Sequence, residues 1–324
     1  MRTALTDLLE IDHPVMLAGM GGVSYHRLVG AVSEAGGFGC LGASVMPKDE
    51  MVAEIRGVRA LTDKPFGVDL LTAMPADLLS QVELLIKEGA SVFVAGLGVP
   101  RDAIDLCHER GVLVANMCGK VVHAVHAVEA GCDLVIAQGT EAGGHTGQVA
   151  TMPLVPQIVD AVEGRVPVVA AGGIYDGRGL AAALALGAVG VWLGTRFIAT
   201  PEARGVLGYK DRLLTTGEDG TVISRAYSGK TMRVLRNSWT EEWEASGREV
   251  QRFPVQAVTA MQEGVFHLGG DESTDGVDPE RECYPAGQGV GGINTLEPAG
   301  DIVRRIVEEA EAVLAGLTPA RARA

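Results

Sequence analysis

One imidazole and one carboxylate stand among four glycines in the segment Ala-Gln-Gly-Thr-Glu-Ala-Gly-Gly-His-Thr-Gly, residues 137–147. The two groups belong to His145 and Glu141, and an apolar run, residues 134–138, leads into them. Glycine lets a backbone turn at positive φ and come close to a flat ligand. An imidazole can take up a proton near neutral pH or hold an oxyanion. His145 is therefore a candidate catalytic residue; the alternative is a structural turn with an incidental histidine.

Two later apolar runs also stop at glycine. Residues 168–174 read Val-Val-Ala-Ala-Gly-Gly-Ile, and residues 191–197 read Val-Trp-Leu-Gly-Thr-Arg-Phe. In a (β/α)8 barrel, the loops after strands seven and eight commonly form a phosphate site. Backbone N–H groups in a concave set bind such an anion without a lysine. The two segments therefore predict an anion site, provided that they are the last strands of a barrel.

Eight apolar, β-rich runs alternate with helical segments. The predicted strands are 15–19, 38–43, 65–71, 91–98, 112–117, 134–139, 166–173 and 190–199. The predicted helices between them are 25–34, 48–61, 76–88, 101–110, 121–130 and 176–186. Near-continuous apolarity indicates strands buried on both faces, as in parallel sheets. The even spacing favours a closed α/β fold, a (β/α)8 TIM barrel, and an open doubly wound sheet is the alternative.

Changes in composition along the chain predict three parts. They are a barrel over residues 1–200, a smaller α+β capping domain over 201–296, inserted after strand eight, and a C-terminal helix over 297–324 that packs back on the barrel. The longest connection follows the sixth strand and carries His145, and a long connection at a strand's carboxyl end is where function is expected. Residues 269–282 are acidic, and we interpret them as a solvated loop.

Composition excludes several classes of partner. Hydrophobic residues make up 47% of the chain, which supports a large core, and the net charge is −14. That charge argues against nucleic acid and against an anionic membrane surface. No apolar run could span a bilayer, and no secretory leader is visible. The five cysteines contain no Cys-x-x-Cys pair, so reduced, mostly buried thiols in a cytoplasmic protein are expected.

Taken together, the motifs resemble the nitronate monooxygenase (2-nitropropane dioxygenase-like) family. They are residues 137–147, A-A-G-G-I-Y-D-G-R-G at 170–179, L-G-T-R-F-I-A-T at 193–200, A-G-M-G-G-V-S at 18–24 and K-P-F-G-V-D-L at 64–70. The resemblance covers nearly the whole chain. It implies a TIM barrel that binds FMN under a small capping domain, with no metal.

The resemblance also implies roles for particular residues. The FMN phosphate would lie on backbone N–H groups at the two glycine-rich strand ends, and His145 would face the substrate above the flavin. The implied cofactor-binding residues are Met20, Gly21, Gly22, Asp69, Gln138, Gly139, Gly144, Gly172, Gly173, Gly194, Thr195 and Gln288. His123 and His126 share a helix face, but no third metal ligand is evident.

Two positions depart from the family pattern, and one segment is unusually basic. The family commonly has asparagine where this chain has Asp69, and proline where it has Gly19. Asp69 could hydrogen-bond a ribityl hydroxyl. The basic segment, residues 225–237, carries Arg225, Lys230, Arg233 and Arg236. It is interpreted as a solvated helix or as inter-domain ion pairs, or, more specifically, as a clamp for the diphosphate of a nicotinamide cofactor or of coenzyme A.

Three functions stay open. The first is an FMN-dependent oxidoreductase of the nitronate monooxygenase type, which oxidises a carbon acid such as a nitronate with dioxygen. The second is an NAD(P)H-dependent flavin reductase that acts on a quinone, an enoyl thioester or a cyclic, steroid-derived CoA thioester. The two departures and the basic segment favour the second. The third is a binding barrel without chemistry. A homodimer is left open in each case.

Overall fold

The computed structural model describes residues 1–72, 77–96, 98 and 100–317. The strands are β1 Val15–Leu17, β2 Gly39–Gly42, β3 Phe66–Leu71, β4 Val92–Gly96, β5 Leu113–Cys118, β6 Leu134–Gln138, β7 Gly144–His145, β8 Val168–Ala171, β9 Val191–Leu193, β10 Thr221–Ser224 and β11 Met232–Leu235. The helices are α1 Ala4–Leu9, α2 His26–Glu34, α3 Lys48–Leu61, α4 Leu78–Lys87, α5 Arg101–Glu109, α6 Val121–Ala130, α7 Thr151–Val162, α8 Gly177–Ala185, α9 Thr195–Ile198, α10 Tyr209–Thr215, α11 Ser238–Ser246, α12 Val255–Gln262 and α13 Ala299–Leu317, with a 3-10 helix, η2, at Gln288–Gly292.

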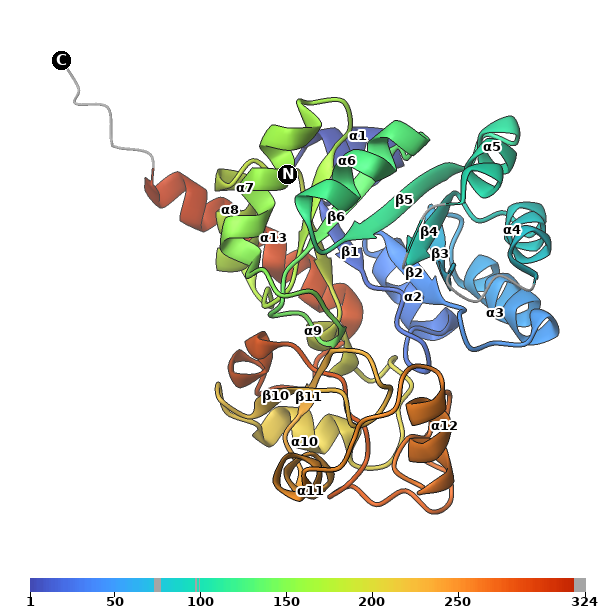
Figure 1. Cartoon of the computed structure of the whole chain (residues 1–324). Helices are drawn as coiled ribbons and strands as arrows, with labels where there is room; N and C mark the ends of the chain where they lie inside the picture. The colour runs from blue at the N-terminus through green and yellow to red at the C-terminus, as the bar shows by residue number, and fades with distance from the viewer. Residues whose placement is uncertain (73–76, 97, 99, 318–324) are drawn as a thin grey trace.

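Eight parallel strands form a barrel, with helices around it (Figure 1). Their order is β1-β9-β8-β6-β5-β4-β3-β2. The ends of this order meet, because Met16 of β1 bridges Phe38 just before β2, and the Leu17 N–H donates to the Phe38 carbonyl at 2.8 Å. The predicted TIM barrel is therefore confirmed, and the alternative of an open sheet is wrong.

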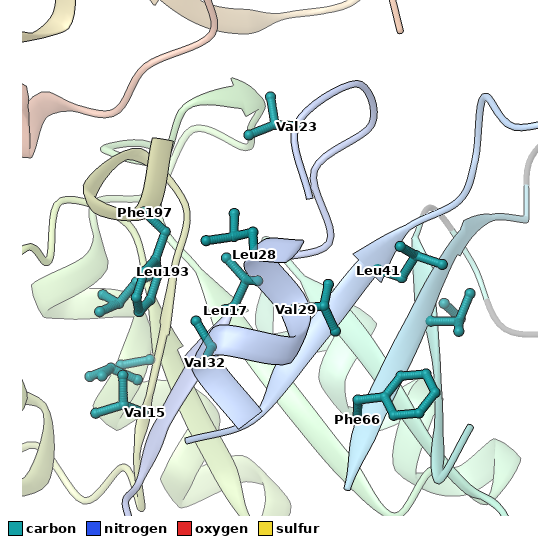
Figure 2. Packing of buried hydrophobic residues seen from close by; sticks show 14 of the residues in the cluster. Val15, Leu17, Val23, Leu28, Val29, Val32, Leu41, Phe66, Leu193 and Phe197 are labelled. Carbon is teal, nitrogen blue, oxygen red and sulfur yellow. The ribbon is translucent and has the colours of Figure 1, made fainter. Parts of the chain in front are cut away.

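Alternation along each strand divides the core into two layers. On β1, Met16 points into the barrel among the residues of the inner cluster, whereas Val15 and Leu17 belong to the outer one. Figure 2 shows part of the outer cluster, where Leu28, Val29 and Val32 of α2 lie beside β1 and β2. Burial on both faces explains why these strands are apolar throughout.

A second, smaller sheet faces the barrel's carboxyl end. Its order is β10-β11-β7, with both pairs antiparallel. The short β7 belongs to the loop after β6, so this loop joins the barrel to residues of the predicted capping domain. A separate apolar cluster around Tyr227 and Trp239 supports this sheet, and α10, α11 and α12 surround it (Figure 1). The domain boundaries at 200 and 296 stay predictions.

Several predicted elements differ from the structure. The predicted strand 190–199 is wrong beyond Leu193, because Thr195–Ile198 form α9. The buried guanidinium of Arg196, in this helix, donates hydrogen bonds to the carbonyls of Ala199 and Thr295. The contact with Thr295 cannot be inferred from the local sequence. Helices α1 and α7 were not predicted. Leu97 of predicted strand 91–98, Ala76 of predicted helix 76–88 and residues 318–324 lie outside the described residues.

The C-terminal helix α13 packs on α8 and α2. The five cysteines are free and buried, as expected. Across the described ranges, no helix is both long enough and apolar enough to cross a membrane.

Candidate functional site

A cavity of about 1200 Å³ opens at the carboxyl ends of the barrel strands, beneath the smaller sheet. Ligand pockets commonly measure roughly 300–1,000 Å³, so this one is large enough for more than one small molecule. Eleven of the thirteen predicted site residues line it: Met20, Gly21, Gly22, Asp69, Gln138, Gly144, His145, Gly172, Gly173, Gly194 and Thr195. The fold therefore brings together residues from five separate strand ends.

The other two predicted residues do not line the cavity. A Cβ on Gly139 would lie 2.2 Å from Thr151 Oγ1, so this glycine allows close packing on the start of α7. Gln288 is exposed, and its neighbours Gly287 and Gly289 line the cavity instead. The structure therefore places neither residue in the cavity lining, and their contact with the cofactor stays a prediction.

The glycine-rich strand ends form a cradle of main-chain groups. Gly172 follows β8 with a φ of +110°, and Gly194 follows β9 and is the N-cap residue of α9. The hydrogen bonds among the described residues use none of the amides of Gly172, Gly173, Gly194 and Thr195. A Cβ on Gly172 would lie 2.7 Å from Thr151 Oγ1. Free amides at two adjacent strand ends suit an anionic group such as a phosphate.

His145 enters the cavity from β7. Its strand pairs with β11, where His145 lies opposite Met232. The imidazole Nε2 is 2.9 Å from Ser228 Oγ, and Ser228 is itself fully buried. Burial lowers the pKa of His145, and the positive charge of Lys230 lowers that pKa further. The imidazole is therefore neutral at physiological pH and can offer a hydrogen bond to a substrate oxygen.

Glu141, the carboxylate of this loop, does not line the cavity. Its Oε2 accepts hydrogen bonds from the backbone N–H and the hydroxyl of Thr151, each at 2.5 Å. Thr151 is the first residue of α7, so the carboxylate caps the positive end of that helix. Glu141 therefore fixes the loop that presents His145.

Asp69 forms part of the cavity floor. It ends up inside the barrel because its neighbours Val68 and Leu70 point outward into the helix layer. It is 3% exposed, and desolvation by burial raises its pKa to about 8. The side chain is therefore protonated at neutral pH and can donate a hydrogen bond. A neutral acid at this position does not repel an anionic ligand.

The cations of the basic segment, residues 225–237, lie in different surroundings in the structure. It is not a solvated helix, because Met232–Leu235 form β11. Arg233 is buried and donates to the Thr140 carbonyl at 2.9 Å and to Thr221 Oγ1 at 3.1 Å. Arg225 and Lys230, by contrast, line the cavity. Arg225 also borders a second hollow beside Arg252.

Sequence reasoning missed one pair of residues. His267 and Glu282 both line the cavity, and His267 Nδ1 is 2.7 Å from Glu282 Oε2. Both lie in or beside the acidic stretch that was interpreted as solvated, yet Glu282 is 1% exposed. The partner of that carboxylate is His267, 15 residues earlier in the chain, so the sequence shows only a histidine that precedes an acidic segment. His123 and His126 also border the cavity, but no cluster of three or more His, Cys, Asp or Glu groups suited to a metal occurs in the described part of the chain.

The structure thus combines a closed parallel barrel with free amides after β8 and β9 and a neutral imidazole above a large cavity. These are features of a (β/α)8-barrel protein whose strand ends are suited to an anionic ligand. The chain belongs to the nitronate monooxygenase family, whose sequence profile matches residues 2–78 and 75–309. The resemblance noted from the motifs is therefore confirmed.

Individual relatives point to different oxidoreductases. One relative is a (3aS,4S,5R,7aS)-5-hydroxy-7a-methyl-1-oxo-octahydro-1H-indene-4-carboxyl-CoA dehydrogenase of Mycobacterium tuberculosis. The two sequences are 46% identical over 249 residues, and this match covers 76% of the present chain and 70% of the relative. It is similar to the solved structure of FabK from Thermotoga maritima (TM-score 0.85, 37% identity, 98% of each chain). It is also similar to a nitroalkane oxidase from Streptomyces ansochromogenes (TM-score 0.82, 30% identity, 98% of this chain and 100% of that one).

Proposed function

We propose that the protein is an FMN-dependent oxidoreductase whose substrate is the CoA thioester of a cyclic hydroxy acid. The observation that carries this proposal is the extent of the cavity. It runs from the free amides at Gly172 and Gly194 to Arg225 and Lys230, in a chain of net charge −14. A ligand with anionic groups at a distance from its reacting end fits such a cavity.

The residues present suit FMN. The amides of Gly172, Gly173, Gly194 and Thr195 would hold its phosphate. The flat ring would lie where Met20, Gly21 and Gly22 line the cavity. Protonated Asp69 would donate a hydrogen bond toward the ring or the ribityl chain. When bound, FMN would supply the two-electron redox chemistry that no side chain offers.

Arg225 and Lys230 suit the phosphates of coenzyme A. Arg225 Nε bonds the Gly229 carbonyl at 3.0 Å, and Lys230 Nζ lies 4.5 Å from the centre of the Phe253 ring, so both cations are held at the rim. Neither has a carboxylate partner within salt-bridge distance among the described residues. Unpaired cations beside a cavity are suited to phosphate groups.

The M. tuberculosis relative supports the class of substrate. Its substrate carries a hydroxyl and a CoA thioester on neighbouring ring positions. In this chain, the neutral imidazole of His145 would hold the thioester oxygen, and the smaller sheet would exclude water from the reacting carbon.

The second candidate is oxidation of a nitronate by dioxygen. The family profile and the likeness to the nitroalkane oxidase favour it. A small nitronate makes no use of the cations at the rim, which is why we place this function second. An NAD(P)H-dependent reductase would use the same site, with a nicotinamide cofactor as the electron donor.

Anaerobic mixing of the FMN-loaded protein with one compound at a time tests these functions. β-Hydroxycyclohexanecarboxyl-CoA should bleach the flavin absorbance; bleaching by NADH or NADPH alone would instead identify a reductase. Nitrite release from ethyl nitronate in air, with no response to the thioester, would overturn the proposal. Arg225→Gln combined with Lys230→Gln should weaken CoA binding at least tenfold in calorimetry, whereas exposed Arg101→Gln should not.

A further inference from the structure

The cavity contains a second imidazole whose orientation is fixed by a buried carboxylate. Glu282 Oε1 accepts the backbone N–H of His267 at 2.9 Å, and Oε2 lies 2.7 Å from His267 Nδ1. The Glu282 side chain is 1% exposed, and that of His267 is 21% exposed. No ion pair other than the one with His267 involves Glu282 among the described residues.

A carboxylate is a costly choice for a purely structural role here. A glutamine would also accept a hydrogen bond, without the free energy needed to bury a charge. The charge is useful where the imidazole becomes cationic, because the carboxylate then compensates the imidazolium. With Nδ1 donating to Glu282, Nε2 is the acceptor, and it has no hydrogen bond within the described residues.

The segment that carries His267 lies over the mouth of the barrel. A Cβ on Gly22 would lie 2.9 Å from the amide nitrogen of Gly269, so the segment contacts the loop after β1 directly. His267 therefore borders the cavity from the side of the smaller sheet, whereas His145 comes from the loop after β6.

The two cavity histidines are held differently. His145 already contacts Ser228, and burial and Lys230 lower its pKa, so it stays neutral. His267 faces a carboxylate. Two groups whose surroundings differ in this way are suited to separate roles, one as a hydrogen-bond donor and one as a base.

We propose that His267, oriented by Glu282, is the base that removes the hydroxyl proton of the substrate. The inference rests on the proposed function, which supplies that proton. The substrate O–H bond would break and its proton would join Nε2, as the carbon that bears the hydroxyl loses a hydride and becomes a carbonyl carbon. FMN, when bound, would supply the two-electron oxidant for that hydride. Glu282 is a positioning residue, which holds the ring and balances the imidazolium.

A matched control exists elsewhere in the chain. His26 receives the same pair of contacts from Glu54, at 2.8 Å to its backbone N–H and 2.7 Å to Nδ1. Glu54 is 15% exposed, and neither residue lines the cavity. Substitutions of this pair report what loss of such a contact costs away from the site.

Chemical rescue tests the inference with β-hydroxycyclohexanecarboxyl-CoA as the probe. His267→Gly should lower kcat about 10²–10⁴-fold, with little change in KM, in FMN absorbance or in the circular dichroism melt. Added imidazole should restore kcat in proportion to its concentration. Glu282→Gln should lower kcat at least tenfold, and His26→Gly and Glu54→Gln should stay within twofold of wild type. Unchanged kcat in His267→Gly, or no rescue by imidazole in a folded, FMN-loaded variant, overturns the inference.

Failure of the proposed function would look different. In that case the wild-type protein does not oxidise the thioester, and diethyl pyrocarbonate labelling of the FMN-loaded protein tests the part of the inference that concerns this chain alone, a free His267 Nε2 oriented by Glu282. A free Nε2 supported by Glu282 should be carbethoxylated at His267, with a rate that falls severalfold in Glu282→Gln. No label on His267, or a rate that Glu282→Gln leaves unchanged, overturns it.

Discussion

Gly19 and Asp69 are in contact across the mouth of the barrel. A Cβ placed on Gly19 would lie 2.3 Å from the Cβ of Asp69, nearer than two carbon atoms can approach without a shift. These are the two positions that the motif resemblance marked as departures, from proline and from asparagine. The structure therefore joins two separate departures into one local arrangement, in which a missing side chain makes room for a buried acid.

Gly19→Ala should therefore destabilise the protein by about 1–3 kcal/mol, the usual cost of overpacking, and should weaken FMN binding. Gly21→Ala is the matched control, since a Cβ there would meet only Val45, at 3.6 Å. Urea unfolding and FMN titration measure both effects. Gly19→Ala combined with Asp69→Gly should recover part of the loss. Strictly additive effects would show that the two residues do not interact.

Asp69→Asn should remove a pH dependence of stability. Burial raises the pKa of Asp69 from its usual value of 3.8 to about 8, so between these values the folded state holds a proton that the unfolded state releases. Stability from this group is complete below the lower value and is lost as pH rises through the higher one. Between pH 5.5 and 7.5, wild type should lose about 3 kcal/mol relative to Asp69→Asn.

Urea unfolding of the FMN-free protein at pH 5.5 and pH 7.5 measures the free energy of unfolding on which the Asp69 prediction depends. Asp219→Asn, an acid-to-amide change at an exposed position, is the control. Parallel stability curves for wild type and Asp69→Asn would contradict a protonated Asp69.

His145→Gln should lower kcat about 10²–10³-fold, the cost of losing a hydrogen bond to developing charge in a site without water. Ser228→Ala, which removes the contact to Nε2 at 2.9 Å, should lower kcat less, by about tenfold. FMN absorbance should stay unchanged in both variants. His108→Gln, on the surface, is the control, and equal losses in Ser228→Ala and His145→Gln would place the effect in folding rather than in chemistry.

Gly172→Ala should abolish FMN binding. Gly172 has a φ of +110°, and its Cβ would meet Thr151 Oγ1 at 2.7 Å beside the free amides. Gly164 also has a positive φ, of +71°, but a Cβ there meets nothing within 4 Å. Gly164→Ala should therefore cost only the backbone strain of about 1–2 kcal/mol and bind FMN normally. A fluorescence titration with FMN separates the two variants.

Patterns local to the chain were sufficient for the barrel and for most of the site. Strands buried on both faces are apolar along their length, as in Leu134–Gln138 and Val168–Ala171, and their glycine-rich ends follow directly in sequence. Because carboxyl ends of parallel strands meet at one rim, Gly172, Gly194 and His145 could be placed together before any coordinates were known. The early end of β9 at Leu193 was missed because α9 depends on Arg196 bonding a distant carbonyl.

Contacts between residues far apart in the chain decided the remaining features of the site, and such contacts produce no periodic pattern in the sequence. The register of β7 on β11 sets His145 against Ser228. Burial, which depends on every neighbouring element at once, makes Asp69 neutral and turns Glu282, from an acidic stretch, into the partner of His267. The sequence by itself thus determined the barrel and the cradle of backbone amides. Tertiary packing alone decided the protonation state of Asp69 and the partners of His145 and His267, because desolvation and neighbouring charges depend on the surroundings of a group and not on its spacing in the sequence.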